Sequence, residues 1–244
     1  MVISSVLRSS GILFLTLVST LGSAVSGFLT GSDRVPSAIM RWWGKEFIRI
    51  GGWKVRVEGL EHLPAGGAIL ASNHQSLVDI PLFVAALPRE VRFIAKRELG
   101  RIPLFGTAMA AAGNLFIDRE DPQDAVHLVR KATNRMERGQ MVVVFPEGTR
   151  SRDGTIGEFK PGAFYLARKT GVPLLPVLIE GGHKALPRGS LLFRPSALSV
   201  KVLPPVTADD GRPLDREEMA EETRRRILSA RREREGQCSE VVLV

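Results

Sequence analysis

Short apolar runs recur along the middle of the chain and alternate with stretches of helical periodicity. Continuous apolar runs predict buried strands at 68–71, 93–95, 115–117, 141–145 and 174–179. Residues 53–58 alternate apolar and charged side chains, as in a strand with one solvated face, and 198–203 predicts a last strand. Helical stretches lie between the strands, most clearly at 123–138 and 161–170. This alternation predicts an α/β fold with a mixed, largely parallel central sheet flanked by helices.

The N-terminal stretch departs from this pattern. No charged residue occurs from Gly11 to Thr30, and about 20 apolar residues are enough to span a hydrocarbon core. Serine and glycine dilute its second half, so a single membrane span, an interfacial anchor and a cleaved signal peptide remain open. The following stretch, 37–50, has apolar residues at helical spacing, basic residues elsewhere and the adjacent Trp42 and Trp43. A helix packed on the domain is the alternative, but we favour membrane attachment by both stretches.

The chain is expected to form one folded domain with an extension at each end. We expect membrane-anchoring helices over residues 1–50, the α/β domain over 51–210, and a charged C-terminal helix and tail over 211–244. Within that tail, the helix is predicted over 215–234. Its arginines alternate with glutamates, which indicates a solvated face rather than a dedicated binding site.

Composition narrows the range of partners. The 244 residues are enough for one sizeable core, and the net charge of +8 favours an anionic partner such as a phospholipid surface, a phosphorylated substrate or nucleic acid. No aromatic-rich strand face or recognition helix supports nucleic-acid binding. Cys238 is the only cysteine, so a disulfide within the chain and a cysteine-rich metal site are excluded, and a reducing compartment fits.

A histidine and an aspartate lie between a predicted strand and a predicted helix. His74 and Asp79 follow the apolar run 68–71, and Pro81 is tolerated in the first turn of the helix that comes next. Five residues along a helix would separate their side chains by roughly 140°, so they can meet only if His74 precedes the helix. Asp79 would then orient one ring nitrogen and leave the other as a general base. A capping histidine with a first-turn aspartate is the structural alternative.

Cationic and hydroxyl groups follow three other predicted strands. Lys96 follows one strand and Arg119 another, while the loop after 141–145 contains Gly148, Thr149 and Arg150. Open α/β sheets bind ligands at the carboxyl ends of their strands, and arginine suits phosphate. Each group alone is more often a surface charge, but their recurrence at equivalent ends predicts an anion site near the histidine.

Four blocks in this sequence resemble those of the 1-acyl-sn-glycerol-3-phosphate (lysophosphatidic acid) acyltransferase family. They are NHQSLVD at 73–79, GNLFIDR at 113–119, FPEGTRS at 145–151 and VPLLPV at 172–177. Similar stretches also occur at 95–99 with 102–106 and at 159–164, and the likeness covers roughly residues 50–205. A single His-x-x-x-x-Asp is a weak signal, whereas all these blocks in order are specific.

The resemblance implies a reaction and roles for His74 and Asp79. By that likeness, His74 removes the proton from the sn-2 hydroxyl of a lysophosphatidate, and Asp79 orients the histidine. The hydroxyl oxygen then attacks the thioester of acyl-CoA or acyl-carrier protein and gives phosphatidate. Backbone N–H groups at the helix start after His74 are candidates for stabilising the oxyanion.

The resemblance also implies how the acceptor is held. Arg119 and Arg150, with Lys96 assisting, would bind its phosphate, and Glu147 and Gly148 would contact its glycerol region. The apolar block 172–177 is expected to be core. No metal or bound cofactor is implied, because the acyl thioester is a substrate. The expected location is the cytoplasmic side of a cell membrane, in a bacterium the inner membrane.

Three other functions remain open. Another lysolipid, such as lyso-ornithine lipid, could be the acceptor. His74 could instead activate water, which would make the protein a hydrolase. A non-catalytic module that binds anionic lipid through its basic charge is the third.

Overall fold

The central sheet has seven strands in the order β1-β7-β6-β2-β5-β3-β4 in a computed structural model that describes residues 2–118, 121–207 and 213–240. All strand pairs are parallel except β6 with β7. The strands are β1 (Lys54–Glu58), β2 (Ala68–Ser72), β3 (Val91–Lys96), β4 (Leu115–Ile117), β5 (Met141–Val144), β6 (Leu174–Glu180) and β7 (Ala197–Val202). The predicted mixed, largely parallel sheet is therefore confirmed.

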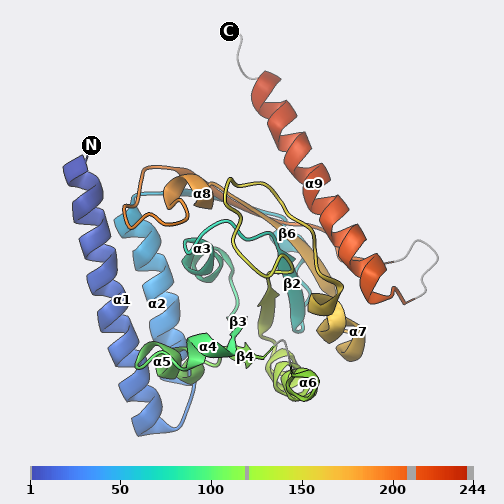
Figure 1. Cartoon of the computed structure of the whole chain (residues 1–244), viewed down its shortest axis with the longest axis horizontal. Helices are drawn as coiled ribbons and strands as arrows, with labels where there is room; N and C mark the ends of the chain where they lie inside the picture. Colours follow the sequence, from blue (N-terminus) through green and yellow to red (C-terminus); the bar gives the residue numbers. More distant parts are fainter. Residues whose placement is uncertain (1, 119–120, 208–212, 241–244) are drawn as a thin grey trace.

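Helices cover both faces of this sheet. The α-helices are α1 (Val2–Thr30), α2 (Arg34–Gly51), α3 (Asp79–Ala86), α4 (Arg97–Gly100), α5 (Phe105–Ala111), α6 (Pro122–Glu137), α7 (Tyr165–Thr170), α8 (Gly182–Ala185) and α9 (Arg216–Glu240), with short 3-10 turns at Leu60–His62 and Pro161–Phe164. Figure 1 shows α1 and α2 together on one side of the molecule and α9 on the opposite side.

The core has two layers because alternate residues of each buried strand face opposite sides of the sheet. On β2, Ala68 and Leu70 pack with α2 and α3, whereas Ile69 and Ala71 pack with α6, α7 and α9. A strand buried on both faces reads as a continuous apolar run, which is the pattern of the sequence here. The block 172–177 provides buried residues of β6, so its predicted role in the core is confirmed.

The two N-terminal helices form an antiparallel pair, and α2 belongs to the core. Phe47 and Ile48 of α2 are buried, and a Cβ at Gly44 would lie 2.7 Å from a methyl carbon of Val84 on α3. Trp43 donates to Thr16 Oγ1 of α1 at 3.1 Å. The alternative prediction for residues 37–50, a helix packed on the domain, is therefore correct for the buried face of α2.

The outer helix α1 has a buried face and an exposed apolar face. Its stretch from Ser4 to Thr30 is long and apolar enough to cross a membrane by length and composition, and 28% of the most apolar part is buried. The large apolar side chains that α1 leaves exposed include Leu13, Phe14, Leu17, Val18, Leu21, Val25, Phe28 and Leu29. An apolar surface of this length needs a partner other than water.

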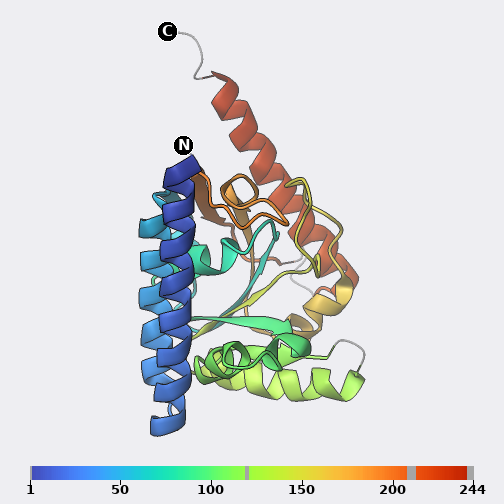
Figure 2. The ribbon, with the colours of Figure 1, turned by 60° about the vertical axis from the view of Figure 1, so that its left-hand side comes forward.

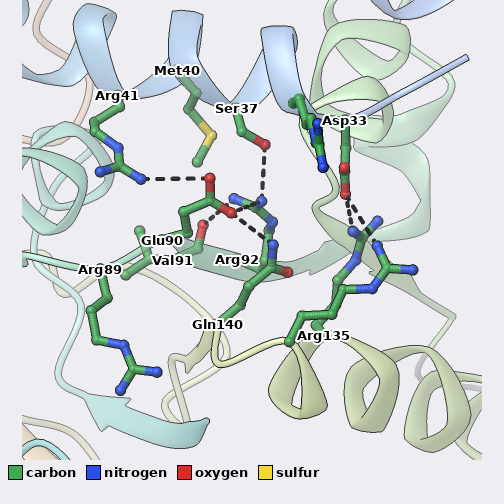
Figure 3. A network of polar contacts seen from close by, with 12 residues as sticks. Asp33, Ser37, Met40, Arg41, Arg89, Glu90, Val91, Arg92, Arg135 and Gln140 are labelled. Atoms are coloured by element: carbon green, nitrogen blue, oxygen red, sulfur yellow. Dashed lines mark hydrogen bonds and ion pairs between the residues drawn. The ribbon is translucent and has the colours of Figure 1, made fainter. Parts of the chain in front are cut away.

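A cluster around a buried arginine joins α2, β3 and the residue directly before β5 (Figure 3). The guanidinium of Arg92 is almost fully buried and donates to Ser37 Oγ at 2.9 Å and to Glu90 Oε2 at 2.6 Å. The same Glu90 oxygen accepts from Gln140 Nε2 at 2.7 Å. This set of four residues is called the Arg92 cluster below.

A second ion pair lies beside the Arg92 cluster. Asp33, at the start of α2, pairs with Arg135 of α6 (Figure 3). Burial alone would raise the pKa of Asp33, but the hydrogen bond and charge of Arg135 outweigh it and lower that pKa below 3.8. The N-terminal helices are therefore tied to the domain by charge as well as by apolar packing.

The predicted solvated face of the C-terminal helix is wrong for part of α9. Ile227 and Thr223 are buried, and Arg224 donates from Nε to Gly157 O at 2.7 Å. Arg231 donates to Gly154 O at 3.0 Å. Long arginine stems can cross an apolar surface and still place their charged ends on backbone carbonyls, so charge alternation alone does not identify the solvated face.

Candidate active site

His74 and Asp79 meet at the carboxyl end of β2, in the arrangement that their spacing required. His74 lies in the loop before α3, Asp79 is the first residue of α3, and Pro81 is in its first turn. The distance from His74 Nδ1 to Asp79 Oδ2 is 2.7 Å, and the side chains are 16% and 1% exposed. A carboxylate only accepts hydrogen bonds, so Nδ1 donates and Nε2 has the lone pair of a base.

The aspartate is fixed by further contacts. Oδ2 of Asp79 also accepts from the backbone N–H groups of Gln75 at 2.7 Å and Ser76 at 2.8 Å. Oδ1 faces Gly182, where a Cβ would lie only 2.5 Å away, so the close approach requires glycine. Because Gln75 and Ser76 donate to Asp79, these predicted oxyanion donors are already occupied. The sequence interpretation missed Gly182, which is far along the chain.

Glu147 lies behind the histidine rather than on the pocket wall. Its Oε1 accepts from the backbone N–H of His74 at 2.8 Å, and its Oε2 accepts from Gly157 N–H at 3.2 Å. Burial raises the pKa of Glu147, and the hydrogen bonds from the His74 and Gly157 backbone oppose that rise. Both oxygens are used inside the protein, so this geometry favours a positioning role over contact with the acceptor's glycerol.

The loop after β5 wraps around the histidine. Ser151 N–H donates to His74 O at 2.8 Å, and Gln75 Nε2 donates to Gly154 O at 3.3 Å. Phe145 stacks on the imidazole with ring centroids 4.0 Å apart. Arg224 and Arg231 of α9 donate to carbonyls of the same loop. The C-terminal helix thus braces the loop that supports His74.

A cavity of about 400 Å³ opens beside His74. Among the predicted ligand residues, Lys96, Gly148, Thr149 and Arg150 lie on its wall with the histidine, whereas Arg119 lies outside the described residues. The rest of the wall is mainly apolar and includes residues of α1, α2, β3, α4 and α5, among them Met40, Trp43, Ile94, Leu99, Phe105, Ala108 and Met109. The cavity therefore combines a base, cations and a long apolar surface.

The contribution of α1 to this cavity was not predicted. Thr16, Ser19, Thr20 and Ser23 line it from α1. Their spacing of three and four residues places them on one face of a helix. Two of them, Ser19 and Ser23, are among the residues that dilute the apolar pattern of the N-terminal stretch, so part of the signal was present in the sequence. In the structure they line the cavity.

A histidine–aspartate pair at a strand end, beside an apolar cavity with a basic rim, is suited to general-base chemistry on a substrate that has an apolar chain and an anionic group. The acyltransferase family model matches residues 54–180, which is more than half of the chain. The chain therefore belongs to the acyltransferase family.

The chain is also similar in sequence to individual proteins of known name. The chain is 41% identical over 140 residues to the chloroplastic 1-acyl-sn-glycerol-3-phosphate acyltransferase LPAT1 of Arabidopsis thaliana, and the match covers 57% of this chain and 39% of that protein. It is 35% identical over 184 residues to 1-acyl-sn-glycerol-3-phosphate acyltransferase alpha of Homo sapiens, covering 75% of this chain and 65% of the relative. The matches thus span less than two thirds of these relatives.

A solved structure is similar over nearly the whole chain. The crystal structure of the 1-acyl-sn-glycerophosphate (LPA) acyltransferase PlsC from Thermotoga maritima has a TM-score of 0.75 and 28% identity, and covers 94% of this chain and 96% of that one. This likeness extends beyond the segment that the family model matches, and so includes the terminal helices of the fold.

Proposed function

We propose that the protein transfers a fatty acyl group from a thioester, acyl-CoA or acyl-carrier protein, to the sn-2 hydroxyl of lysophosphatidate, giving phosphatidate. The observation that carries this proposal is the His74–Asp79 pair on the wall of an apolar cavity that also contains Arg150 and Lys96. The names of the relatives supply the substrate class.

His74 acts as base and then as acid. Its Nε2 accepts the hydroxyl proton while the hydroxyl oxygen forms a bond to the thioester carbonyl carbon. Asp79 stabilises the imidazolium that results. When the tetrahedral intermediate collapses, the carbon–sulfur bond breaks and the imidazolium returns the proton to the leaving thiolate. After one turnover His74 has returned to its starting protonation state, and the products are the acylated lipid and the free thiol.

The basic rim holds the acceptor's phosphate. Arg150 and Lys96 are on the cavity wall with His74, and Thr149 adds a hydroxyl. Guanidinium binds phosphate through charge-assisted hydrogen bonds, which are stronger than neutral ones. Arg119 keeps its predicted role in the same contact. The apolar remainder of the cavity receives the acyl chain.

The exposed face of α1 attaches the enzyme to one leaflet of a membrane. Helix α2 packs along α1 and carries the exposed basic residues Arg41, Lys45 and Arg49. If α1 spanned the bilayer, these charges would enter the hydrocarbon at about 2.5–3.5 kcal/mol each. An interfacial position avoids that cost, and the charge of +8 suits the anionic cytoplasmic leaflet.

The test is the KM of each substrate in Arg150→Ala. We expect the KM for lysophosphatidate to rise roughly tenfold, the loss of a charged hydrogen bond, with the KM for acyl-CoA unchanged. Monoacylglycerol, which lacks the phosphate, is the matched acceptor and should not distinguish the variant from wild type. An equal rise for both substrates would contradict the phosphate role, and a wild-type preference for lyso-ornithine lipid would identify a different acceptor.

A further inference from the structure

We propose that residues 99–105, which run from the end of α4 to the start of α5, form a second lipid-contacting element that faces an anionic membrane together with α1. This 99–105 turn was noted in the sequence only as part of a family block. The inference rests on the proposed membrane attachment, and it adds a surface of the α/β domain to it.

The turn presents apolar side chains to the outside. Leu99, Ile102, Leu104 and Phe105 are 40%, 45%, 39% and 38% exposed. Single exposed apolar residues are ordinary on a protein surface, but four within seven residues form a patch. The turn also contains one long charged side chain, that of Arg101, which is exposed as well. Apolar side chains beside a cation suit the interface of an anionic bilayer.

The backbone of the turn is strained. Leu104 has φ of 65° and ψ of −51°, and it is the only non-glycine residue with positive φ in the ranges that the structure describes. Phe105 N–H donates to Pro103 O at 2.7 Å, which closes a three-residue γ-turn of the strained form. Strain and apolar exposure both cost free energy in water. Contact with lipid would remove the cost of apolar exposure. The strained backbone would then serve to hold the apolar side chains at the lipid surface.

The turn is continuous with the cavity and with α1. Leu99 and Phe105 line the cavity beside His74, so the turn forms part of its rim. Helix α5 packs closely on α1, since a Cβ at Gly27 would lie 2.5 Å from the Cβ of Ala111. Figure 2 shows α5 against the lower half of α1. The turn, the cavity wall and α1 therefore form one continuous apolar surface.

The test is an environment-sensitive fluorophore at Ile102, which is exposed and does not line the cavity. In a Cys238→Ser background, the label on Ile102→Cys should shift to the blue with phosphatidylglycerol–phosphatidylcholine vesicles and be quenched by brominated lipid. The matched control is Val126→Cys on α6, which is 59% exposed and should show neither effect. This readout does not depend on catalysis.

The outcomes separate the turn from the proposed function. If vesicles bind but the label at Ile102→Cys is unshifted, the membrane attachment by α1 stands and the turn is not a lipid contact. A shift caused by acyl-carrier protein instead of vesicles would also overturn the lipid assignment, in favour of a protein partner. Absence of vesicle binding would overturn both the turn and the α1 attachment.

A kinetic measurement uses the same position. Ile102→Asn should lose roughly tenfold in affinity for vesicles, the effect of removing one buried aliphatic side chain. Its kcat/KM for lysophosphatidate in vesicles should fall accordingly, with kcat/KM for a monomeric short-chain lysophosphatidate unchanged. Equal losses with both forms of the acceptor would contradict a lipid contact. Absence of transfer by the wild type with either acceptor would refute the proposed function alone.

Discussion

Two buried polar groups in this molecule have opposite designs. In the Arg92 cluster, Ser37 and Glu90 accept hydrogen bonds from the buried guanidinium, and Gln140 donates to Glu90, which connects elements that are distant in sequence. The His74–Asp79 pair is also held by short hydrogen bonds, but one edge of the imidazole faces a cavity. The first arrangement uses its hydrogen bonds within the protein and holds α2 in place. The second keeps one nitrogen for a substrate.

The difference between the two groups shows that burial alone does not identify a functional residue. A buried charge that is hydrogen-bonded by its neighbours contributes to structure. A buried pair that presents a base to an apolar cavity is positioned to act on a substrate. If this distinction is right, substitutions in the two groups should separate activity from stability.

The largest effect is expected for His74→Ala. Loss of the general base should lower kcat by about 10²–10⁴. The variant should stay folded, because Asp79 keeps its hydrogen bonds from the backbone N–H groups of Gln75 and Ser76. Acyl transfer and urea unfolding should be measured on the same preparation. A variant that loses stability in parallel with activity would remove the contrast with the Arg92 cluster.

Glu90→Ala should have the reverse effect. It leaves the buried guanidinium of Arg92 without its carboxylate. Removal of one partner from a fully buried pair costs about 3–5 kcal/mol, and we expect less here because Glu90 is 33% exposed and partly screened by water. The folded fraction should retain wild-type kcat, because Glu90 does not line the cavity. The matched control is Glu61→Ala, whose side chain is 75% exposed and which should unfold like wild type. A kcat reduced as strongly as in His74→Ala would mean that the cluster also serves catalysis.

An intermediate effect is expected for Arg224→Ala. The substitution removes the hydrogen bond to Gly157 O and loosens the loop that holds Glu147 and the backbone of His74. A small misplacement of a catalytic group should lower kcat by roughly tenfold with little change in KM.

Two variants control the Arg224 experiment. Arg224→Lys keeps a donor and should restore part of the activity, and Arg232→Ala removes an exposed arginine from the same helix. If Arg232→Ala lowers kcat as much as Arg224→Ala, the effect comes from helix charge and not from the loop contact.

The smallest effect is expected for Asp33→Asn. The pKa of Asp33 is lowered in the folded protein, so its ion pair with Arg135 stabilises the fold above the unfolded pKa and the contribution disappears as the pH falls through the folded value. The variant should be less stable than wild type by about 1 kcal/mol at neutral pH. Urea unfolding at pH 7 and near pH 3 should show the difference shrinking in acid, and a constant difference would contradict the ion-pair explanation.

Local patterns predicted the contact between His74 and Asp79 and the sheet. The apolar run of β2 and the proline after Asp79 were sufficient to place His74 before a helix, because both signals act within a few residues. The same holds for the strand ends that bear Lys96 and Arg150. Their meeting in one cavity follows from parallel strand pairing, which the alternation of elements predicts.

Contacts between distant residues were not predictable in the same way. Nothing near Arg92 shows that Ser37 will accept from its guanidinium or that Gln140 will donate to its partner Glu90, since both contacts join segments that are distant in sequence. The role of Glu147 depends on Gly157, and that of Gly182 on Asp79. Such contacts depend on tertiary packing, which a single sequence encodes only through the whole fold.

The central claim is that His74 activates the acceptor's hydroxyl and not water. The most direct measurement follows thiol release from acyl-CoA together with the acylated lipid and free fatty acid, with and without lysophosphatidate. We predict one phosphatidate for each thiol released, and negligible release without the acceptor. Thiol release without lysophosphatidate, matched by free fatty acid, would contradict the claim and identify a hydrolase.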